Sequence, residues 1–401
     1  MSGKTSMDAL ILTCGTGGGH NTAALAVKEA LESRGHRVDL LNPYELLGSR
    51  AASRINNAYI RTVQRAPWVF GCAYLAGEAY RRLPVRSPVY QANRAAEKVM
   101  EQYLNSHSYQ VILATHVFPG MLLTRLKRRG VPLPPLILIA TDYACIPFFE
   151  EVDCDYCVIP SPKLTNEFLR FGFRPEQLRP LGIPVRKSFR TPESKPEARR
   201  RLQLSEDSPC ILLAGGSIGA GKIKGAVRLF ELSAHRRPAC RLVVVCGNNR
   251  RLYQCLRRRC KKDPSVRILS QTNQMADYMR AADLLISKPG GLSSTEAAVS
   301  GAPLVHFSPI PGCESKNYRF FTQNGMSLGA KSTLGLLHVL CDKKTPARLE
   351  AMKKRQAENV NPEAALDICR LAEEAAEANS PKKLDKCRKK GYSMRENSTN
   401  R

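Results

Sequence analysis

The stretch 284–298 constrains the fold of this chain more than any other part of its sequence. It reads Leu-Leu-Ile-Ser-Lys-Pro-Gly-Gly-Leu-Ser-Ser-Thr-Glu-Ala-Ala. The apolar run Leu284–Ile286 is typical of a parallel strand that is buried on both faces. Gly290 and Gly291 allow a tight turn and a close approach of the backbone to a ligand. A helix follows, and we expect one of the hydroxyl residues at 293–295 to cap it.

Such a strand–turn–helix unit has a chemical use. The free N–H groups and the positive dipole end at the start of the helix suit a phosphate group. Glu296 lies one turn into the predicted helix, where its carboxylate could bind a ribose diol, although a glutamate there can also serve only the helix dipole. Lys288 precedes the glycines and could add positive charge, or it could be a solvated loop lysine.

Strand and helix patterns alternate along both halves of the chain, which predicts two doubly wound Rossmann-like domains. We expect an N-terminal domain over 1–190, a second domain over 191–375, and a basic, disordered tail over 376–401. A charged, proline-containing run at 190–200 is the predicted linker. The expected strands are Ala9–Leu12, Val38–Leu41, Val111–Ala114, Leu136–Ala140, Cys157–Ile159, Cys210–Ala214, Leu242–Cys246, Val266–Leu269, Leu284–Ile286 and Leu304–Phe307.

The charge balance points to an anionic partner. The sequence has 62 Lys and Arg against 35 Asp and Glu, a formal charge of +27, so nucleic acid, anionic lipid and nucleotide are all candidates. No apolar stretch reaches the ~18 residues of a membrane span, and no secretory signal is recognisable. We therefore expect a cytoplasmic protein with reduced thiols.

Three short motifs suggest other functions, but each lacks a residue that the function requires. The run 15–17 begins like a dinucleotide fingerprint, but His20 occupies its third glycine position. The run 216–222 fits a Walker A loop up to its lysine, but Ile223 stands where a magnesium-binding hydroxyl is required. Cys154 and Cys157 form a single CxxC with no companion ligands, so we do not expect a zinc site there.

Three blocks together carry a family resemblance. They are Thr-Gly-Gly-Gly-His-Asn at 16–21, the glycine-rich stretch at 284–298, and Pro-Ile-Pro-Gly-Cys-Glu-Ser-Lys-Asn at 309–317. In this order they resemble the diacylglycerol glycosyltransferases of glycosyltransferase family 28, which include the monogalactosyldiacylglycerol synthases and the processive glucosyl-diacylglycerol synthases. The resemblance covers roughly 8–335 and implies the GT-B architecture, in which two Rossmann-like domains face a cleft.

The resemblance implies a UDP-sugar site in the second domain. It places the diphosphate at Gly216 and Ser217, with Lys288, Gly290 and Gly291 nearby, and it places the ribose at Glu296. Asn273 and Met275 match the segment beside the uracil, and Glu314 and Asn317 match residues that hold the hexose. Cys313 stands where the family often has glutamine, which puts the usual sugar contact there in doubt. No Asp-x-Asp metal motif is visible, so we expect neither a metal nor another cofactor.

The resemblance places the acceptor and the catalytic base in the first domain. His20 is one candidate for the base, and Asp142 is the rival. The two could also act as a pair, with the carboxylate orienting the imidazole. Acceptor contacts are expected from Gly18, Gly19, His116 and Trp68.

Residues 43–95 interleave aromatic residues with arginines, which suits a membrane–water interface. An ordinary pair of amphipathic helices packed on the sheet would show the same pattern. The matching family region takes the lipid acceptor and touches the bilayer, which favours the membrane. We expect a peripheral protein at the cytoplasmic face of the plasma membrane, where it contacts anionic lipids through this segment and through the basic tail.

The combined hypothesis is an inverting glycosyltransferase that moves glucose or galactose from UDP-glucose or UDP-galactose to diacylglycerol. The first alternative is the same chemistry on another lipid, such as a polyprenyl-linked sugar. A second is a basic nucleic-acid-binding protein, although no recognised nucleic-acid motif is present and no nucleic-acid partner is expected. A third is a nucleotide-sugar-binding regulator that has lost transfer activity.

Overall fold

The computed structural model describes residues 6–15, 18–48, 67–232 and 240–379, and for residues 67–70 it describes the backbone only. The basic tail beyond residue 379 and much of the aromatic–arginine segment, including the Trp68 side chain, therefore lie outside the described residues. Our predictions for the tail and for Trp68 stay predictions.

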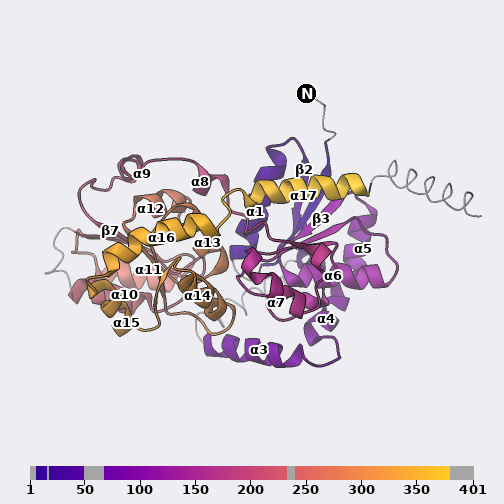
Figure 1. Cartoon of the computed structure of the whole chain (residues 1–401), viewed down its shortest axis with the longest axis horizontal. Coiled ribbons are helices and arrows are strands. Elements are labelled where there is room, and N and C mark those ends of the chain that lie inside the picture. Colours follow the sequence, from indigo (N-terminus) through magenta and orange to yellow (C-terminus); the bar gives the residue numbers. More distant parts are fainter. Residues whose placement is uncertain (1–5, 16–17, 49–66, 233–239, 380–401) are drawn as a thin grey trace, which may run out of the picture.

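The chain forms two sheets of six parallel strands each (Figure 1). The first has the order β2-β1-β3-β4-β5-β6 and the second β12-β11-β10-β7-β8-β9. Two doubly wound domains that face each other are the predicted GT-B arrangement. The strands are β1 Asp8–Leu12, β2 Arg37–Leu41, β3 Val111–Ala114, β4 Leu136–Ile139, β5 Tyr156–Val158, β6 Leu178–Arg179, β7 Cys210–Ala214, β8 Arg241–Val245, β9 Val266–Leu269, β10 Leu284–Ser287, β11 Leu304–Phe307 and β12 Leu328–Ala330.

Helices cover both faces of each sheet, which is why the central strands are apolar on both sides. The four residues of β3 and the four of β4 are all buried. The α-helices are α1 Gly18–Glu32, α3 Pro67–Tyr80, α4 Pro88–Ala92, α5 Glu97–Asn105, α6 Val117–Arg128, α7 Thr165–Arg170, α8 Lys187–Arg190, α9 Lys195–Arg201, α10 Ile223–Leu232, α11 Arg250–Arg259, α12 Met275–Ala281, α13 Gly291–Val299, α14 Cys313–Gln323, α15 Thr333–Cys341, α16 Thr345–Asn359 and α17 Ala364–Ala378.

The last helix, α17, returns to the first domain. It lies over the first sheet in Figure 1, and its residues Ile368 and Ala372 belong to the same buried cluster as Ile11 of β1. Glu373 anchors it, because its carboxylate accepts hydrogen bonds from Arg34 over 2.7 and 2.9 Å. The polypeptide therefore crosses between the domains twice, once near 187–194 and once just before α17.

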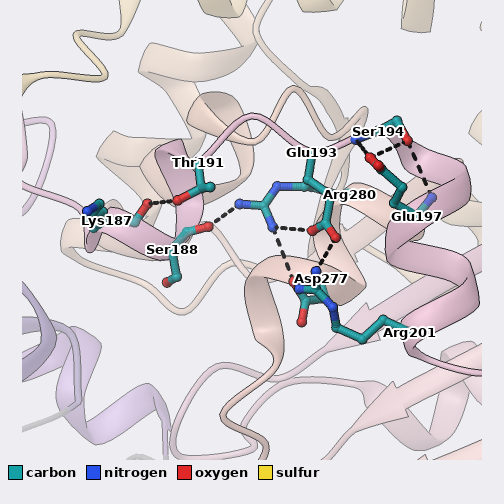
Figure 2. Close-up of polar contacts among 9 residues, drawn as sticks. All are labelled: Lys187, Ser188, Thr191, Glu193, Ser194, Glu197, Arg201, Asp277 and Arg280. Carbon is teal, nitrogen blue, oxygen red and sulfur yellow. Dashed lines mark hydrogen bonds and ion pairs between the residues drawn. The ribbon is translucent and has the colours of Figure 1, made fainter.

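The first crossing is tied to the second domain by a half-buried ion-pair network (Figure 2). Glu193 and Asp277 both contact Arg280, over 3.3 and 3.2 Å, and Arg280 also donates to the carbonyl oxygen of Ser188. Asp277 and Arg280 belong to α12. Part of the predicted linker is helical, as α8 and α9, and the network fixes the short segment between them.

Helix α3 bridges the two domains. Its Glu78 pairs with Lys316 of the second domain over 2.6 Å. Arg81, just beyond the helix, pairs with Glu150 of the first domain over 2.6 Å. Figure 1 shows α3 along the lower edge of the molecule, beneath both domains. None of the helices among the described residues is both long and apolar enough to cross a bilayer.

Candidate active site

A cavity of about 340 Å³ lies between the domains. The first domain contributes the start of α1, and the second contributes residues that follow strands β7, β8, β9 and β10. Seven predicted site residues line this cavity: Gly18, Gly19, Gly216, Ser217, Asn273, Met275 and Glu296. Residues from distant parts of the sequence thus converge at the carboxyl ends of the strands, where doubly wound sheets bind ligands.

The two domains touch at the glycine-rich loops. The backbone N–H of Gly18 donates to the hydroxyl of Ser217 over 3.2 Å. Any Cβ at Gly18 would overlap the Ser217 side chain, so only glycine fits there. This contact puts the start of α1, which carries His20, directly against the predicted diphosphate loop.

Glu296 faces the cavity from α13 and is only 7% exposed. Its carboxylate makes no hydrogen bond within the part of the chain that the structure describes. Burial raises the pKa of Glu296 to about 8, although the nearby Arg186 guanidinium opposes the shift. A buried acceptor of this kind suits a ligand that brings its own hydroxyl donors.

The start of α13 differs from the prediction. The helix begins at Gly291 with Gly290 as its N-cap, and no side chain caps it. The predicted hydroxyl cap was wrong, because Ser294 and Thr295 instead donate backwards to the carbonyl oxygens of Gly290 and Gly291, over 2.7 and 2.8 Å. A Cβ at Gly291 would overlap the carbonyl oxygen of Thr141, so this glycine permits close contact between the domains.

Lys288 and Glu314 form an ion pair beside the predicted diphosphate loop. The Lys288 chain lies across Gly216, whose φ of +67° favours glycine. Burial lowers the pKa of Lys288, but the contact with Glu314 outweighs this and raises it. The other Glu314 oxygen accepts from the N–H of Ile310 over 3.0 Å. Neither side chain lines the cavity, so the pair packs against the loop and does not face the cavity.

Asn317 is fully buried at the interface between the domains. Its Nδ2 donates to Asp142 over 2.7 Å and to the carbonyl oxygen of Pro289 over 3.0 Å. Its Oδ1 accepts from the N–H of Tyr143 over 2.7 Å. In this structure Asn317 therefore joins the domains rather than lining the cavity. Its predicted contact with the hexose stays a prediction.

His20 is oriented by the first domain. Its Nδ1 lies 3.0 Å from the carbonyl oxygen of Thr115 and 2.8 Å from the hydroxyl of Thr141. Because a carbonyl can only accept, Nδ1 carries the proton and Nε2 of the neutral ring keeps a free lone pair. Burial lowers the pKa of His20, opposed by the charge of Asp142. These contacts leave Nε2 able to take a proton.

Asp142 does not hydrogen-bond to the His20 ring among the contacts that the structure describes. Burial raises its pKa, while the hydrogen bond from Asn317 and the His20 ring lower it in part. One of its oxygens is engaged by Asn317. His20 and Asp142 are thus close neighbours, and each affects the pKa of the other. The imidazole is oriented by its hydrogen bonds with Thr115 and Thr141 and not by one with Asp142.

His116 has a structural task at the start of α6. Its Nδ1 accepts from the backbone N–H of Phe118 over 3.1 Å, as an N-cap. Its ring packs edge-on against that of His20, with 4.5 Å between centroids. Burial lowers the pKa of His116 well below its ordinary value, and His20 lowers it further. His116 therefore contacts the candidate base rather than the cavity.

Sequence reasoning gave no role to several residues of the site. Arg186 lines the cavity near Glu296. Thr115 and Thr141 fix the His20 tautomer, and their position at the carboxyl ends of strands β3 and β4 was the available signal. Tyr74 of α3 packs on Gly312 with its hydroxyl buried, and no sequence pattern indicated that this aromatic residue lies at the junction between the domains.

Comparison with known proteins places this geometry in a class. The structure resembles that of MurG from Acinetobacter baumannii, with a TM-score of 0.59 and 15% identity over 92% of this chain and 99% of the other. It also resembles the lipopolysaccharide glycosyltransferase WaaG, with a TM-score of 0.55 and 15% identity over 91% and 99%. At these identities the likeness concerns the fold, which is that of a GT-B glycosyltransferase.

The sequence comparisons give the family. Residues 20–185 match the monogalactosyldiacylglycerol (MGDG) synthase model, and residues 210–371 match the C-terminal domain model of glycosyltransferase family 28. A processive diacylglycerol beta-glucosyltransferase of Bacillus licheniformis is 26% identical over 88% of this chain and 90% of its own length. A probable chloroplastic monogalactosyldiacylglycerol synthase 2 of Oryza sativa subsp. japonica is 29% identical over 81% and 71%. The chain belongs to the diacylglycerol glycosyltransferase family and is a glycosyltransferase.

Proposed function

We propose that this enzyme transfers a hexose, glucose or galactose, from a UDP-sugar to the free hydroxyl of diacylglycerol at a membrane surface, with inversion at the anomeric carbon. The observation that carries the proposal is the contact between Gly18 and Ser217. This contact places the start of α1, which carries the oriented His20, against the glycine-rich loop at Gly216 and Ser217. Such a loop is suited to bind a diphosphate. The relative from Bacillus licheniformis is a diacylglycerol beta-glucosyltransferase, which supports this acceptor.

The donor would lie in the cavity between the domains. Glu296 would accept hydrogen bonds from the ribose hydroxyls, because its carboxylate faces the cavity without a hydrogen-bond donor from the described chain. Asn273 and Met275 would lie beside the base. The diphosphate would contact the loop at Gly216 and Ser217, which the Lys288–Glu314 pair supports. Backbone N–H groups and the start of α13 would offset the charge of the departing nucleotide.

We propose His20 as the general base. The acceptor oxygen would form a bond to the anomeric carbon while the bond from that carbon to the diphosphate breaks. The hydroxyl proton would pass to Nε2 of His20, which is neutral because burial lowers its pKa. The nearby Asp142 would stabilise the imidazolium that forms. Asp142 is the weaker candidate for the base, since Asn317 already occupies one of its oxygens.

The bridging position of α3 favours a lipid acceptor. The helix contacts both domains, and its Leu75 is 66% exposed. An exposed apolar side chain on a helix that contacts both domains suits an acceptor whose acyl chains stay in a bilayer. We extend this proposal to the neighbouring Trp68, whose side chain is not described, and to anionic lipids as the surface that attracts this basic protein.

The experiment is UDP release by the full-length protein with UDP-glucose and UDP-galactose in turn, with and without diacylglycerol in anionic vesicles. The proposal predicts release that depends on diacylglycerol and ranks the two sugars. Release that is unchanged by diacylglycerol but stimulated by a polyprenyl-linked sugar would favour the alternative acceptor. Absence of both UDP binding and UDP release would refute the proposed donor site.

A further inference from the structure

Helix α15 presents an apolar stripe to solvent. Leu334, Leu337, His338 and Cys341 are all exposed, and their spacing places them on one face of the helix. Leu334 is 79% exposed, more than any other large hydrophobic side chain that the structure describes. The opposite side of the helix is also apolar and packs through the buried Leu336. A helix that needed only solvent on its outer face would carry polar residues there.

Basic side chains surround this stripe. Lys331 precedes α15, and Lys343 and Lys344 follow it, all exposed. The acid in this neighbourhood, Asp342, is half-buried and pairs with Arg348 over 3.3 Å. Within the described part of the chain, none of the three lysines forms an ion pair. Their charges are therefore available to an anionic partner.

Helix α10 continues the same surface. It lies beside α15, with Gly225 against Thr333, where an added Cβ would come within 3.0 Å of the threonine hydroxyl. Lys224, Arg228 and Leu232 of α10 are exposed and follow one another at four-residue spacing, on one face. The two helices and the residues that flank α15 thus combine outward leucines with basic side chains that form no ion pair among the described residues.

The position of α15 is informative. Figure 1 shows α15 near the lower edge of the molecule, the edge along which α3 also lies. Leu75 of α3 is exposed like Leu334 of α15. Each domain thus carries an exposed leucine on a helix at this edge. Exposed leucines on both domains suit a partner that is broad enough to contact both.

We propose that the outer face of α10 and α15 is a membrane-docking surface of the second domain and that its occupant is a bilayer containing anionic phospholipid. The leucines would enter the boundary between headgroups and acyl chains, and Lys224, Arg228 and the lysines flanking α15 would contact lipid phosphates. A second copy of this chain is a poorer occupant, because a self-paired surface would bring like charges together. The inference rests on the proposed function, since a lipid acceptor brings the enzyme to a bilayer.

The test compares vesicle binding by the full-length protein and its variants in co-sedimentation. Leu334→Gln/Leu337→Gln should weaken binding to vesicles of phosphatidylcholine and phosphatidylglycerol at least about tenfold. Leu334→Met/Leu337→Met, which keeps the surface apolar, should bind like the wild type. Lys224→Gln/Arg228→Gln should weaken binding to these vesicles by about fivefold per charge. Lys98→Gln/Arg170→Gln, which removes one exposed lysine and one exposed arginine from the first domain, should change binding less than twofold.

A second readout separates this inference from the proposed function. With a short-chain, water-soluble diacylglycerol, every variant should release UDP at the wild-type rate, because the docking surface does not touch the donor cavity. Loss of vesicle binding without any wild-type UDP release would refute the proposed function and leave the docking surface standing. Wild-type vesicle binding by both surface variants would overturn the docking surface. The wild type could instead form a dimer that Leu334→Gln/Leu337→Gln dissociates without any change in vesicle binding. That result would assign the surface to a second copy of the chain.

Discussion

The Nδ2 of Asn317 donates to a carboxylate oxygen of Asp142 across the domain interface, over 2.7 Å. The same amide bonds to Tyr143 and Pro289, so one buried side chain makes three contacts across or along the interface. Through this hydrogen bond the second domain contacts Asp142, the charged neighbour of His20. The domain interface and the electrostatic environment of the candidate base therefore share one amide.

Asn317→Asp should disrupt this link at nearly constant side-chain size. The new carboxylate cannot donate to Asp142 or to the carbonyl oxygen of Pro289, and it adds a negative charge at each contact. We expect UDP release to fall by at least about tenfold and the free energy of unfolding to drop by about 1–3 kcal/mol. Gln323→Glu makes the same chemical change at an exposed position of the same helix and should leave both quantities unchanged. Wild-type activity in Asn317→Asp would show that the bridge has no catalytic consequence.

His20→Gln should lower kcat by about 10²- to 10⁴-fold, the usual contribution of a general base. The affinity for UDP, measured by calorimetry, should stay within about twofold of the wild type. The same substitution at the exposed His107 is the control. If Asp142 is the base instead, Asp142→Asn will cost much more activity than His20→Gln.

The pH profile tests the same residue. Since burial lowers the pKa of His20 below its ordinary value of 6.5, the ring stays neutral and competent as a base to lower pH than a free histidine. At saturating UDP-sugar and diacylglycerol, kcat should rise with pH through that lowered pKa and then level off. An acid limb centred above 6.5 would contradict the assignment of a lowered His20 pKa to this step.

Glu296 should make nucleotide affinity depend on pH. Its pKa is about 8 without ligand, and ribose hydroxyls donate better to the carboxylate than to the neutral acid. UDP binding should therefore tighten by about tenfold as the pH rises from 7 to 9, because the proton no longer has to be released on binding. Glu296→Gln should bind more weakly, with a flat profile over the same range. If UDP affinity depends on pH in the same way in the wild type and in Glu296→Gln, Glu296 does not bind the ribose.

Gly291→Ala tests whether close domain contact needs this glycine. The new Cβ would overlap the Thr141 carbonyl oxygen, so the domains should separate and small-angle scattering should report a larger radius of gyration. Gly290→Ala is the matched neighbour, since its Cβ would meet nothing closer than 3.9 Å. It should keep the wild-type radius. A compact Gly291→Ala protein would show that the interface adapts easily.

The two sheets could be predicted from the sequence because most of their strands are short apolar runs between turns. The prediction for β3, β7, β9 and β11 matches the structure residue for residue. β6 has only two residues, and β12 contains a glycine, so neither gave a strand pattern. The predicted domain boundary at 375 has no independent test, although α17 packs on the first sheet.

The site could be predicted in part. Ser217 and Glu296 line the cavity, as expected for residues that follow parallel strands, while their predicted contacts with diphosphate and ribose came from the family resemblance and stay predictions. The partners of Asn317 could not be predicted, since Asp142 lies 175 residues away in another domain and only closure joins them. The hydrogen bond between His20 and Thr115 could not be predicted either. It uses the backbone carbonyl of Thr115, which every residue type has.

The stereochemistry of the product tests the central claim most directly. The wild-type enzyme would be incubated with the α-linked donors UDP-glucose and UDP-galactose and with diacylglycerol, and the glycolipid would be analysed by mass spectrometry and proton NMR. In-line attack assisted by His20 predicts one hexose joined to diacylglycerol in the β configuration as the first product. An α-linked product, or a hexose on another acceptor in the same mixture, would contradict the account.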